Sequence, residues 1–215
     1  VYIETTIPSY YCDGRPALAA DIARTREWWD VEREDYECFI SLVVLDELAS
    51  GAYASQAACL ALVEGLPLLA VEREVLDIAE AYRARGLMPR DPAADSVHLA
   101  LASFYRMEYL LTWNCRHLAN ANKVRHLEAL NTRMGLPFRS LRRRTCCYRR
   151  SRTMKSDSPI VDEVRQRRHA ISERFGHDLG AYADYLKELE KKYKSRVVSQ
   201  VTVVPPRPEG NTKMP

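Results

Sequence analysis

Long hydrophobic runs are missing from the sequence. No apolar stretch approaches the roughly 20 residues that a membrane-spanning helix requires, so we expect no transmembrane segment. The first residues, VYIETT, are typical of a β-strand rather than of a secretion signal. We therefore expect a cytoplasmic protein.

Paired cysteine motifs and glycine-rich loops are also absent. The six cysteines form no C-x-x-C pair, which argues against a disulfide scaffold and favours reduced thiols. Cys115 and His117 are too close together, and lack two further ligands, to indicate zinc. Neither G-x-G-x-x-G nor G-x-x-x-x-G-K-[ST] occurs, so a glycine loop that binds nucleotide phosphates has no support.

Positive and negative charges nearly balance, but they are distributed unevenly. The formal net charge is +3, from 32 basic and 29 acidic side chains. Residues 1–138 contain 13 basic and 20 acidic side chains, residues 139–154 contain 7 arginines and no acid, and residues 155–215 contain 12 basic and 9 acidic side chains. We therefore divide the chain into an acidic domain (1–138), a basic linker (139–154) and a C-terminal segment (155–215).

Short apolar strands alternate with helices in the acidic domain. Pro8 indicates a loop after the first strand, Ser41 is a candidate N-cap, and Pro92 suits the first position of a helix. The alternation predicts an α/β fold with a parallel sheet covered on both faces. We expect strands at 1–4, 37–40, 67–71 and 109–112, and helices at 17–35, 42–50, 53–64, 72–85, 92–107 and 122–134.

Acidic or amide side chains lie near the ends of these predicted strands. Glu4 ends the first strand, Glu47 lies in the helix after the second, Asp95 lies in the helix that leads to the fourth, and Asn114 follows the fourth. Ligands of parallel sheets bind at the carboxyl ends of the strands. Carboxylates suit Mg²⁺ or Mn²⁺, and such ions can support attack of water on a phosphodiester.

Each of these residues also has a purely structural interpretation. Asp95 could stabilise a helix dipole, Asp46 and Glu47 could form the solvated face of a helix, and Asn114 could belong to a turn. Glu4 is less ordinary, because a carboxylate at the end of a buried strand needs a partner or a cation. The joint placement of the acids after successive strands favours a site.

Four stretches of the acidic domain resemble the signature blocks of PIN domains, and most closely those of VapC-like toxins of bacterial type II toxin–antitoxin pairs. They are VYIETTIPSYY (1–11), SLVVLDELASG (41–51), ADSVHLALAS (94–103) and YLLTWNCRHLAN (109–120). The resemblance implies a three-layer α/β/α fold with a parallel central sheet of four to five strands. It also implies Mg²⁺- or Mn²⁺-dependent cleavage of single-stranded RNA, with tRNA as a family expectation, and a homodimer formed through this domain.

The resemblance places the family's acidic positions on Glu4, Glu47 and Asp95, with Asn114 at the usual fourth acidic position. Glu4 and Asp95 are expected to bind the metal directly, Glu47 to bind it or to orient water, and Asn114 to position water or phosphate. The sequence departs from the family in two ways, because Glu replaces the commoner Asp at position 4 and position 114 is neutral. We therefore hypothesise one tightly bound ion and a second recruited by RNA.

Further residues near these positions are candidates for substrate binding. Thr5 and Thr6 carry hydroxyls directly after the first acid. His98 lies one helical turn beyond Asp95, although a buried core histidine is the alternative. Trp113 could stack on an RNA base, whereas Trp28 and Trp29 better suit core or dimer packing. These residues extend the predicted site from metal to substrate.

The basic linker and the C-terminal segment differ from the acidic domain. The basic linker contains the run RSLRRRTCCYRRSRT (139–153). It has three interpretations: a solvated linker, a contact with RNA, or a product of out-of-frame translation before Met154. Residues 156–186 resemble the small antitoxins encoded beside such toxins. Two apolar stripes at helical spacing predict a helix pair that cannot bury itself alone. The stripes are Ile160, Val161, Val164, Ile171 and Phe175, then Leu179, Tyr182, Leu186, Leu189 and Tyr193.

The sequence thus predicts a ribonuclease toxin joined to an antitoxin-like segment that inhibits it in cis; a cognate antitoxin in trans is the other candidate inhibitor. Val197–Val204 is β-prone, and the tail beyond it could place Arg207 near the acids as a surrogate cation. A disordered C-terminus is the alternative for Arg207. Two other functions remain open, a catalytically silent PIN scaffold that binds RNA or protein, and an interaction module whose basic linker binds RNA.

Overall fold

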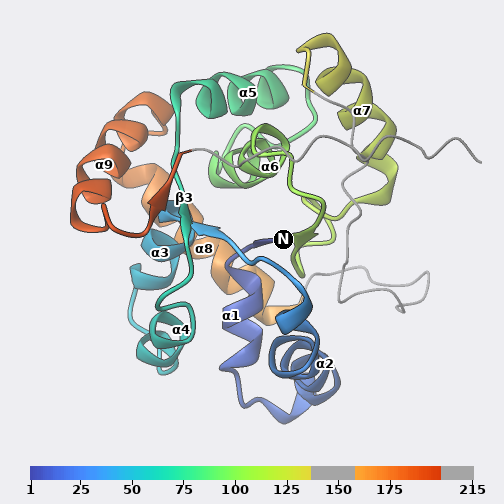
Figure 1. Ribbon diagram of the computed structural model, residues 1–215, viewed down its shortest axis with the longest axis vertical. Helices are drawn as coiled ribbons and strands as arrows, with labels where there is room; N and C mark the ends of the chain where they lie inside the picture. The colour runs from blue at the N-terminus through green and yellow to red at the C-terminus, as the bar shows by residue number, and fades with distance from the viewer. Residues whose placement is uncertain (137–157, 200–215) are drawn as a thin grey trace, which may run out of the picture.

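The computed structural model describes residues 1–136 and 158–199, and parallel strands lie at its centre (Figure 1). Strand β1 pairs with β4, and β3 lies between β2 and β5, with every pairing parallel. A parallel bridge between Tyr2 and Phe39 joins the two sheets, and the Ile3 amide donates to the Phe39 carbonyl at 2.8 Å. The strands are β1 (Tyr2–Ile3), β2 (Ile40–Ser41), β3 (Leu68–Leu69), β4 (Leu110–Leu111) and β5 (Val197–Val198).

The mixed α/β architecture with parallel strands is confirmed, but the ordered strands are shorter than expected. Two small sheets stand where one continuous sheet of four to five strands was predicted. Some strands are short because the chain turns directly into a helix, as at Ser41, which ends β2 immediately before α3. The helices are α1 (Thr6–Tyr11), α2 (Ala19–Asp30), α3 (Leu42–Ala49), α4 (Gln56–Leu62), α5 (Arg73–Ala84), α6 (Ala94–Phe104), α7 (Val124–Arg133), α8 (Pro159–Arg174) and α9 (Leu179–Lys192).

Two predictions made from proline positions are wrong. The expected loop after the first strand is helix α1, with Pro8 at its third position. The first backbone N–H groups of a helix have no partner within it, so proline costs little there. The helix expected to start at Pro92 begins at Ala94, with Ala93 as its N-cap, so Pro92 precedes it.

The C-terminal helices are present and pack against the acidic domain. Helix α8 contacts α1 and α3, and α9 contacts α3 and α5 (Figure 1). Asp178 caps α9, and its side chain accepts from the amides of Gly180 and Ala181. The boundaries at 138 and 154 and the basic linker lie outside the described residues. The apolar side chains that this contact buries include Ile160, Val161, Val164, Ile171, Tyr182 and Leu186.

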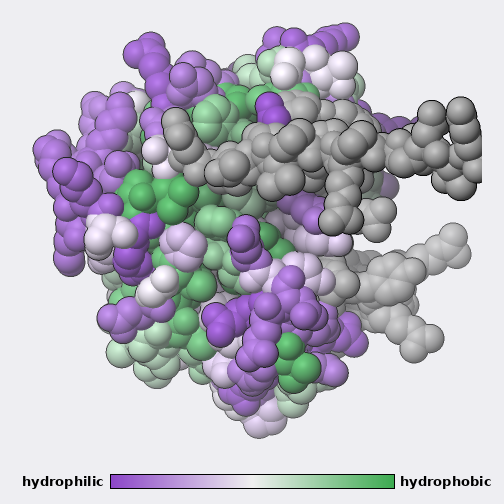
Figure 2. All heavy atoms as spheres, in the orientation of Figure 1, coloured by the Kyte–Doolittle hydropathy of each residue, from purple (hydrophilic) through white to green (hydrophobic). Residues whose placement is uncertain are grey.

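The surface agrees with this packing. On the face shown in Figure 2, hydrophilic side chains gather over α9 and α2 at the rim, with hydrophobic surface between them. Helix α9 turns Tyr182, Ala183 and Leu186 inward, while Lys191 and Lys192 are exposed. Within the described residues, no helix has the length and hydrophobicity needed to cross a membrane.

Strand β5 is anchored by an arginine beside it. The Arg196 guanidinium donates to the carbonyls of Val63 and Leu66 at 2.8–3.1 Å. Hydrogen bonds from charged donors contribute about 1.5–3 kcal/mol to stability. We therefore expect Arg196→Ala to lower the free energy of unfolding by about 2 kcal/mol. Urea denaturation measures this change. Lys194→Ala, at an exposed position, is the control, and an equal effect of both variants would contradict the anchoring role.

Candidate functional site

Four residues predicted from separate strand ends meet at one buried point. Glu4 directly follows β1, Glu47 lies on α3, Asp95 lies on α6 and Asn114 follows β4. Each of them is fully buried. The sheet brings the first and last of these positions together because β1 and β4 are parallel neighbours. The predicted convergence of these side chains is therefore present in the structure.

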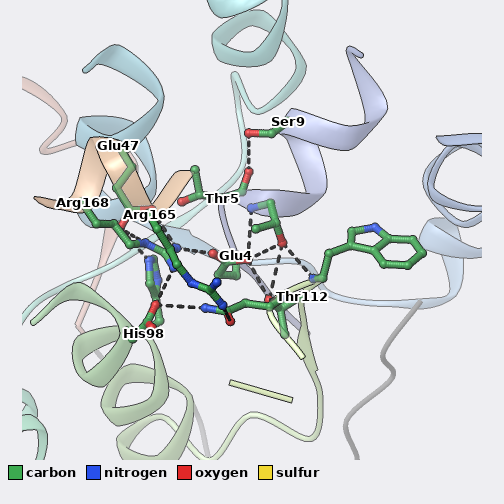
Figure 3. A network of polar contacts seen from close by, with 12 residues as sticks. Glu4, Thr5, Ser9, Glu47, His98, Thr112, Arg165 and Arg168 are labelled. Carbon is green, nitrogen blue, oxygen red and sulfur yellow. Dashed lines mark hydrogen bonds and ion pairs between the residues drawn. The ribbon is translucent and has the colours of Figure 1, made fainter. Parts of the chain in front are cut away.

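A guanidinium from the C-terminal segment lies at the centre of this cluster (Figure 3). Arg168 of α8 donates through Nε and Nη2 to the two oxygens of Glu47 at 2.8 and 2.9 Å. Its Nη1 donates to Asp95 Oδ1 at 2.5 Å, and its Nη2 also contacts Glu4 Oε1. Arg168 is 1% exposed. The carboxylates thus surround a cation that is supplied by the same chain.

The charges in the cluster shift one another's protonation. Burial raises the pKa of Glu47, but the positive charge of Arg168 and the contact with His98 outweigh it, so the pKa lies well below its ordinary value. Burial and Arg168 oppose each other in the same way at Asp95, whose pKa is also lowered. The pKa of Arg168 is raised, because the carboxylates overcome its desolvation. All these groups are charged at neutral pH.

Glu4 is held by donors from two elements. The Thr6 amide, the Thr6 hydroxyl and the Thr112 hydroxyl donate to Glu4 Oε2 at 3.0, 2.5 and 2.8 Å. These bonds leave Oε1 directed at Arg168. Thr6 therefore positions a carboxylate, whereas the sequence predicted that it binds substrate. The Thr5 hydroxyl, also predicted to bind substrate, is buried and has no hydrogen-bond partner among the described residues.

Asp95 is oriented by two neighbours that follow β4. Asn114 Nδ2 donates to Asp95 Oδ1 at 3.1 Å, and His117 Nδ1 lies 2.5 Å from Oδ2. Asn114 Oδ1 in turn accepts from Arg165 Nη2 of α8 at 2.7 Å. The sequence identified Asn114 but gave His117 no role, because the short spacing between Cys115 and His117 argued only against zinc. The Asn114 side chain thus links Asp95 to Arg165, which lies on α8 together with Arg168.

A buried polar chain leads from the sheet to Glu47. The hydroxyls of Ser41 and Tyr2 lie 2.8 Å apart, Tyr2 lies 2.7 Å from His98 Nδ1, and His98 Nε2 lies 3.0 Å from Glu47 Oε1. His98 is fully buried, and the contact with substrate expected of it stays a prediction. Ligand atoms of Glu4, Glu47 and His98 lie within 4.8 Å of one another and could hold a metal ion.

The tryptophans serve the core. Trp113 is stacked on Tyr10 with ring centroids 4.7 Å apart, and its indole N–H donates to Thr25 at 2.9 Å. This indole is 6% exposed, so the prediction that it stacks on an RNA base is wrong for this structure. Trp28 and Trp29 are buried as well, in agreement with the packing role expected for them.

The cation in the cluster comes from a helix rather than from the tail. Arg207, the predicted surrogate cation, lies outside the described residues. Arg168 was missed, although its spacing gave a signal: it follows Val164 by four residues and precedes Ile171 by three, so it lies on the apolar stripe of α8. A charged residue on the buried face of a helix requires a partner. The carboxylates meet that requirement.

A second polar contact joins the C-terminal segment to α3. The hydroxyls of Tyr182 and Tyr185 each donate to Asp46 at 3.1 Å, and Arg174 lies 3.3 Å from it. Asp46 is 5% exposed, so the solvated face suggested for it is wrong. Burial raises the pKa of Asp46 despite these donors. The two neighbouring acids of α3 thus bind different helices, Asp46 mainly α9 and Glu47 α8.

Acid is expected to weaken the attachment of α8. The pKa values of Glu47 and Asp95 are lower in the folded chain than in the unfolded chain. Their stabilising contribution is therefore complete above their ordinary values of about 4.3 and 3.9, and it is lost as the pH falls below them. The urea concentration at the midpoint of unfolding should therefore decrease as the pH is lowered from 7 through this acidic range. Arg168→Ala should flatten this dependence, and an unchanged slope would contradict the assignment.

Comparisons of the chain with protein-family models, curated proteins and solved structures found no match.

Proposed function

We propose that the acidic domain is a metal-dependent endoribonuclease of the PIN type, resembling VapC-like toxins and cleaving single-stranded RNA. The observation that carries this proposal is the meeting of Glu4, Glu47 and Asp95 around a single cation. The finer three-layer α/β/α arrangement of such domains is part of the same proposal. The parallel strands with helices between them support it.

The residues fit a divalent cation. The donors are carboxylate oxygens, which Mg²⁺ and Mn²⁺ prefer, and the guanidinium of Arg168 stands where such an ion would bind. Glu4, Glu47 and Asp95 would hold the ion. When bound, it would supply a nucleophilic water and charge stabilisation for hydrolysis of a phosphodiester. The carboxylates exceed the single charge of Arg168, which favours a cation of higher charge.

The surrounding residues would keep these ligands in position. Thr6 and Thr112 fix one oxygen of Glu4, and Asn114 and His117 fix the two oxygens of Asp95. Asn114 contributes no negative charge at the fourth position. We therefore propose that one ion binds tightly and that the phosphates of RNA bring the charge needed for a second.

The C-terminal segment would then be an inhibitor in cis. Arg168 uses the same carboxylate oxygens that a metal ion would use, so the two cannot bind together. Arg165 covers Asn114 from the same helix, and Asp46 of α3 binds both α9, through Tyr182 and Tyr185, and Arg174 of α8. This arrangement is the one expected of an antitoxin bound to its toxin. A tRNA target, a homodimer and a cytoplasmic location remain predictions.

Removing the Arg168 side chain tests the proposed activity. We expect the full chain with Arg168→Ala to cleave a single-stranded RNA when Mn²⁺ or Mg²⁺ is present, and the unmodified chain to cleave it far more slowly. Arg174→Ala, which removes a half-exposed arginine of the same helix, is the control and should stay inactive. An Arg168→Ala protein that is folded, binds the metal and leaves RNA intact would refute the nuclease.

A scaffold that binds RNA or protein without cutting is the second candidate. The neutral Asn114 at the fourth position favours it, because one carboxylate fewer weakens the binding of a second ion. The same experiment separates the two functions. If the protein is a scaffold, the Arg168→Ala chain would bind RNA in a gel-shift assay and would not cleave it with either Mn²⁺ or Mg²⁺.

A further inference from the structure

His98 stands beside the cation position, and it differs chemically from the other groups there. Its Nε2 and the Nε of Arg168 both point to Glu47 Oε1, at 3.0 and 2.8 Å. The imidazole nitrogen and the guanidinium are therefore neighbours on the same oxygen (Figure 3). If the guanidinium leaves, the imidazole borders the vacated volume together with Glu4 and Glu47, whose ligand atoms lie within 4.8 Å of it.

The other ring nitrogen of His98 is arranged as in a metal-binding histidine. Such histidines usually donate their second N–H to a polar group, which fixes the tautomer and the orientation of the ring. Here Nδ1 lies 2.7 Å from the Tyr2 hydroxyl, which lies 2.8 Å from Ser41 Oγ. All of these groups are fully or almost fully buried. The ring is thus held with Nε2 toward the carboxylates.

Resting on the proposed function, we propose that His98 Nε2 is a ligand of the metal ion, beside Glu4, Glu47 and Asp95, and that it gives the site a preference for a transition-metal ion such as Mn²⁺ over Mg²⁺. Oxygen donors suit Mg²⁺ and Mn²⁺ alike, whereas imidazole suits the later first-row metals Fe, Ni, Cu and Zn. Mn²⁺ belongs to that first-row series and Mg²⁺ does not. One nitrogen among carboxylates therefore moves the preference toward the transition series.

The Tyr2 hydroxyl can pair with Nδ1 of His98 whichever ring nitrogen carries the hydrogen. In the tautomer with the hydrogen on Nε2, His98 donates to Glu47 and accepts from Tyr2. In the tautomer with the hydrogen on Nδ1, His98 would donate to Tyr2, which would donate to Ser41, and Nε2 would be free to offer its lone pair to a metal ion. Either hydroxyl of the Tyr2–Ser41 pair can be the donor. Tyr2 is thus a positioning residue for the ligand.

Spectroscopy of Mn²⁺ tests the ligand directly. The protein is the full chain with Arg168→Ala, and electron spin echo envelope modulation detects nitrogen bonded to Mn²⁺. We expect a nitrogen coupling that changes when histidine carries the heavy nitrogen isotope. In samples that hold bound Mn²⁺, it should persist in Arg168→Ala with His117→Asn, which removes the other imidazole near the carboxylates, and disappear in Arg168→Ala with His98→Asn. If His98→Asn does not fold, the isotope and the His117 variant still decide the assignment.

The possible failures are distinct. Bound Mn²⁺ without a nitrogen coupling, or a coupling lost in His117→Asn, would overturn the role of His98 and leave the proposed nuclease standing on carboxylates. Absence of any Mn²⁺ binding to Arg168→Ala would overturn both proposals.

Calorimetry tests the preference. In the Arg168→Ala chain, we expect Mn²⁺ to bind more tightly than Mg²⁺. Tyr2→Phe should weaken Mn²⁺ binding about ten-fold, because partners of metal-binding histidines contribute on that scale, and should leave Mg²⁺ binding nearly unchanged. Equal losses for both ions would show that Tyr2 acts only on the fold and would overturn the preference.

Discussion

Replacing Arg168 by alanine is expected to lower the free energy of unfolding by about 3–5 kcal/mol, the usual cost of removing one partner of a buried ion pair. The change leaves Glu4, Glu47 and Asp95 without the guanidinium that they surround. Their mutual repulsion in a buried site then favours exposure or protonation. Denaturant unfolding at neutral pH measures the loss.

The same variant should respond to metal. Because a divalent ion replaces the missing charge, Mn²⁺ should raise the unfolding midpoint of Arg168→Ala with the logarithm of its concentration once that exceeds the dissociation constant. It should change the unmodified chain much less. Arg174→Ala is the matched control: it removes an arginine from the same helix, but one that is half-exposed and pairs with Asp46. A large loss in both variants, or no response to Mn²⁺, would contradict a cation site beneath Arg168.

Adding Asp95→Asn to the Arg168→Ala chain should reduce RNA cleavage by about 100-fold or more. A metal ion contributes several kcal/mol of charge stabilisation, and each factor of ten in rate corresponds to about 1.4 kcal/mol. The substitution keeps the shape of the side chain and removes its charge, so the hydrogen bond from Asn114 can persist. Cleavage of a fluorescent single-stranded RNA measures the effect.

Asp46→Asn provides the comparison for this second variant. It makes the same chemical change on a buried acid that faces Tyr182 and Tyr185 rather than the cation position. In the Arg168→Ala chain it should leave cleavage within a few-fold. If the two asparagine variants are equally impaired, the loss reflects packing rather than a metal ligand.

The candidate carboxylates were predictable because strand ends can be identified from the sequence. Glu4 follows an apolar β-prone run, and the helix-and-strand order places Asp95 and Asn114 at the same end of a parallel sheet. Helix α1 was hidden by Pro8, since a proline in a first turn and a proline in a loop give the same local signal. The support of Glu4 by Thr112 depends on strand register, which such short strands do not specify.

The contacts of the C-terminal segment could be predicted only in part. The apolar stripes indicated that α8 and α9 pack on something, and the β-prone run from Val197 indicated a strand. The partner of Arg168 could not be predicted, because it depends on how α8 is rotated against α1 and α3. Position 168 interrupts an apolar stripe, and such an interruption is the feature to look for in similar helices.

Strand β5 lies at the outside of its sheet, beside β3 alone, among the strands that the structure describes. Strand β5 can therefore join or leave without breaking the pairing of β2 with β3 or of β1 with β4. During translation, the first part of the chain can form those pairings before residues 158–199 leave the ribosome. The carboxylate cluster is complete once Asn114 has been synthesised, whereas Arg168 follows later with α8. The speed of translation therefore sets how long the cluster is without its guanidinium.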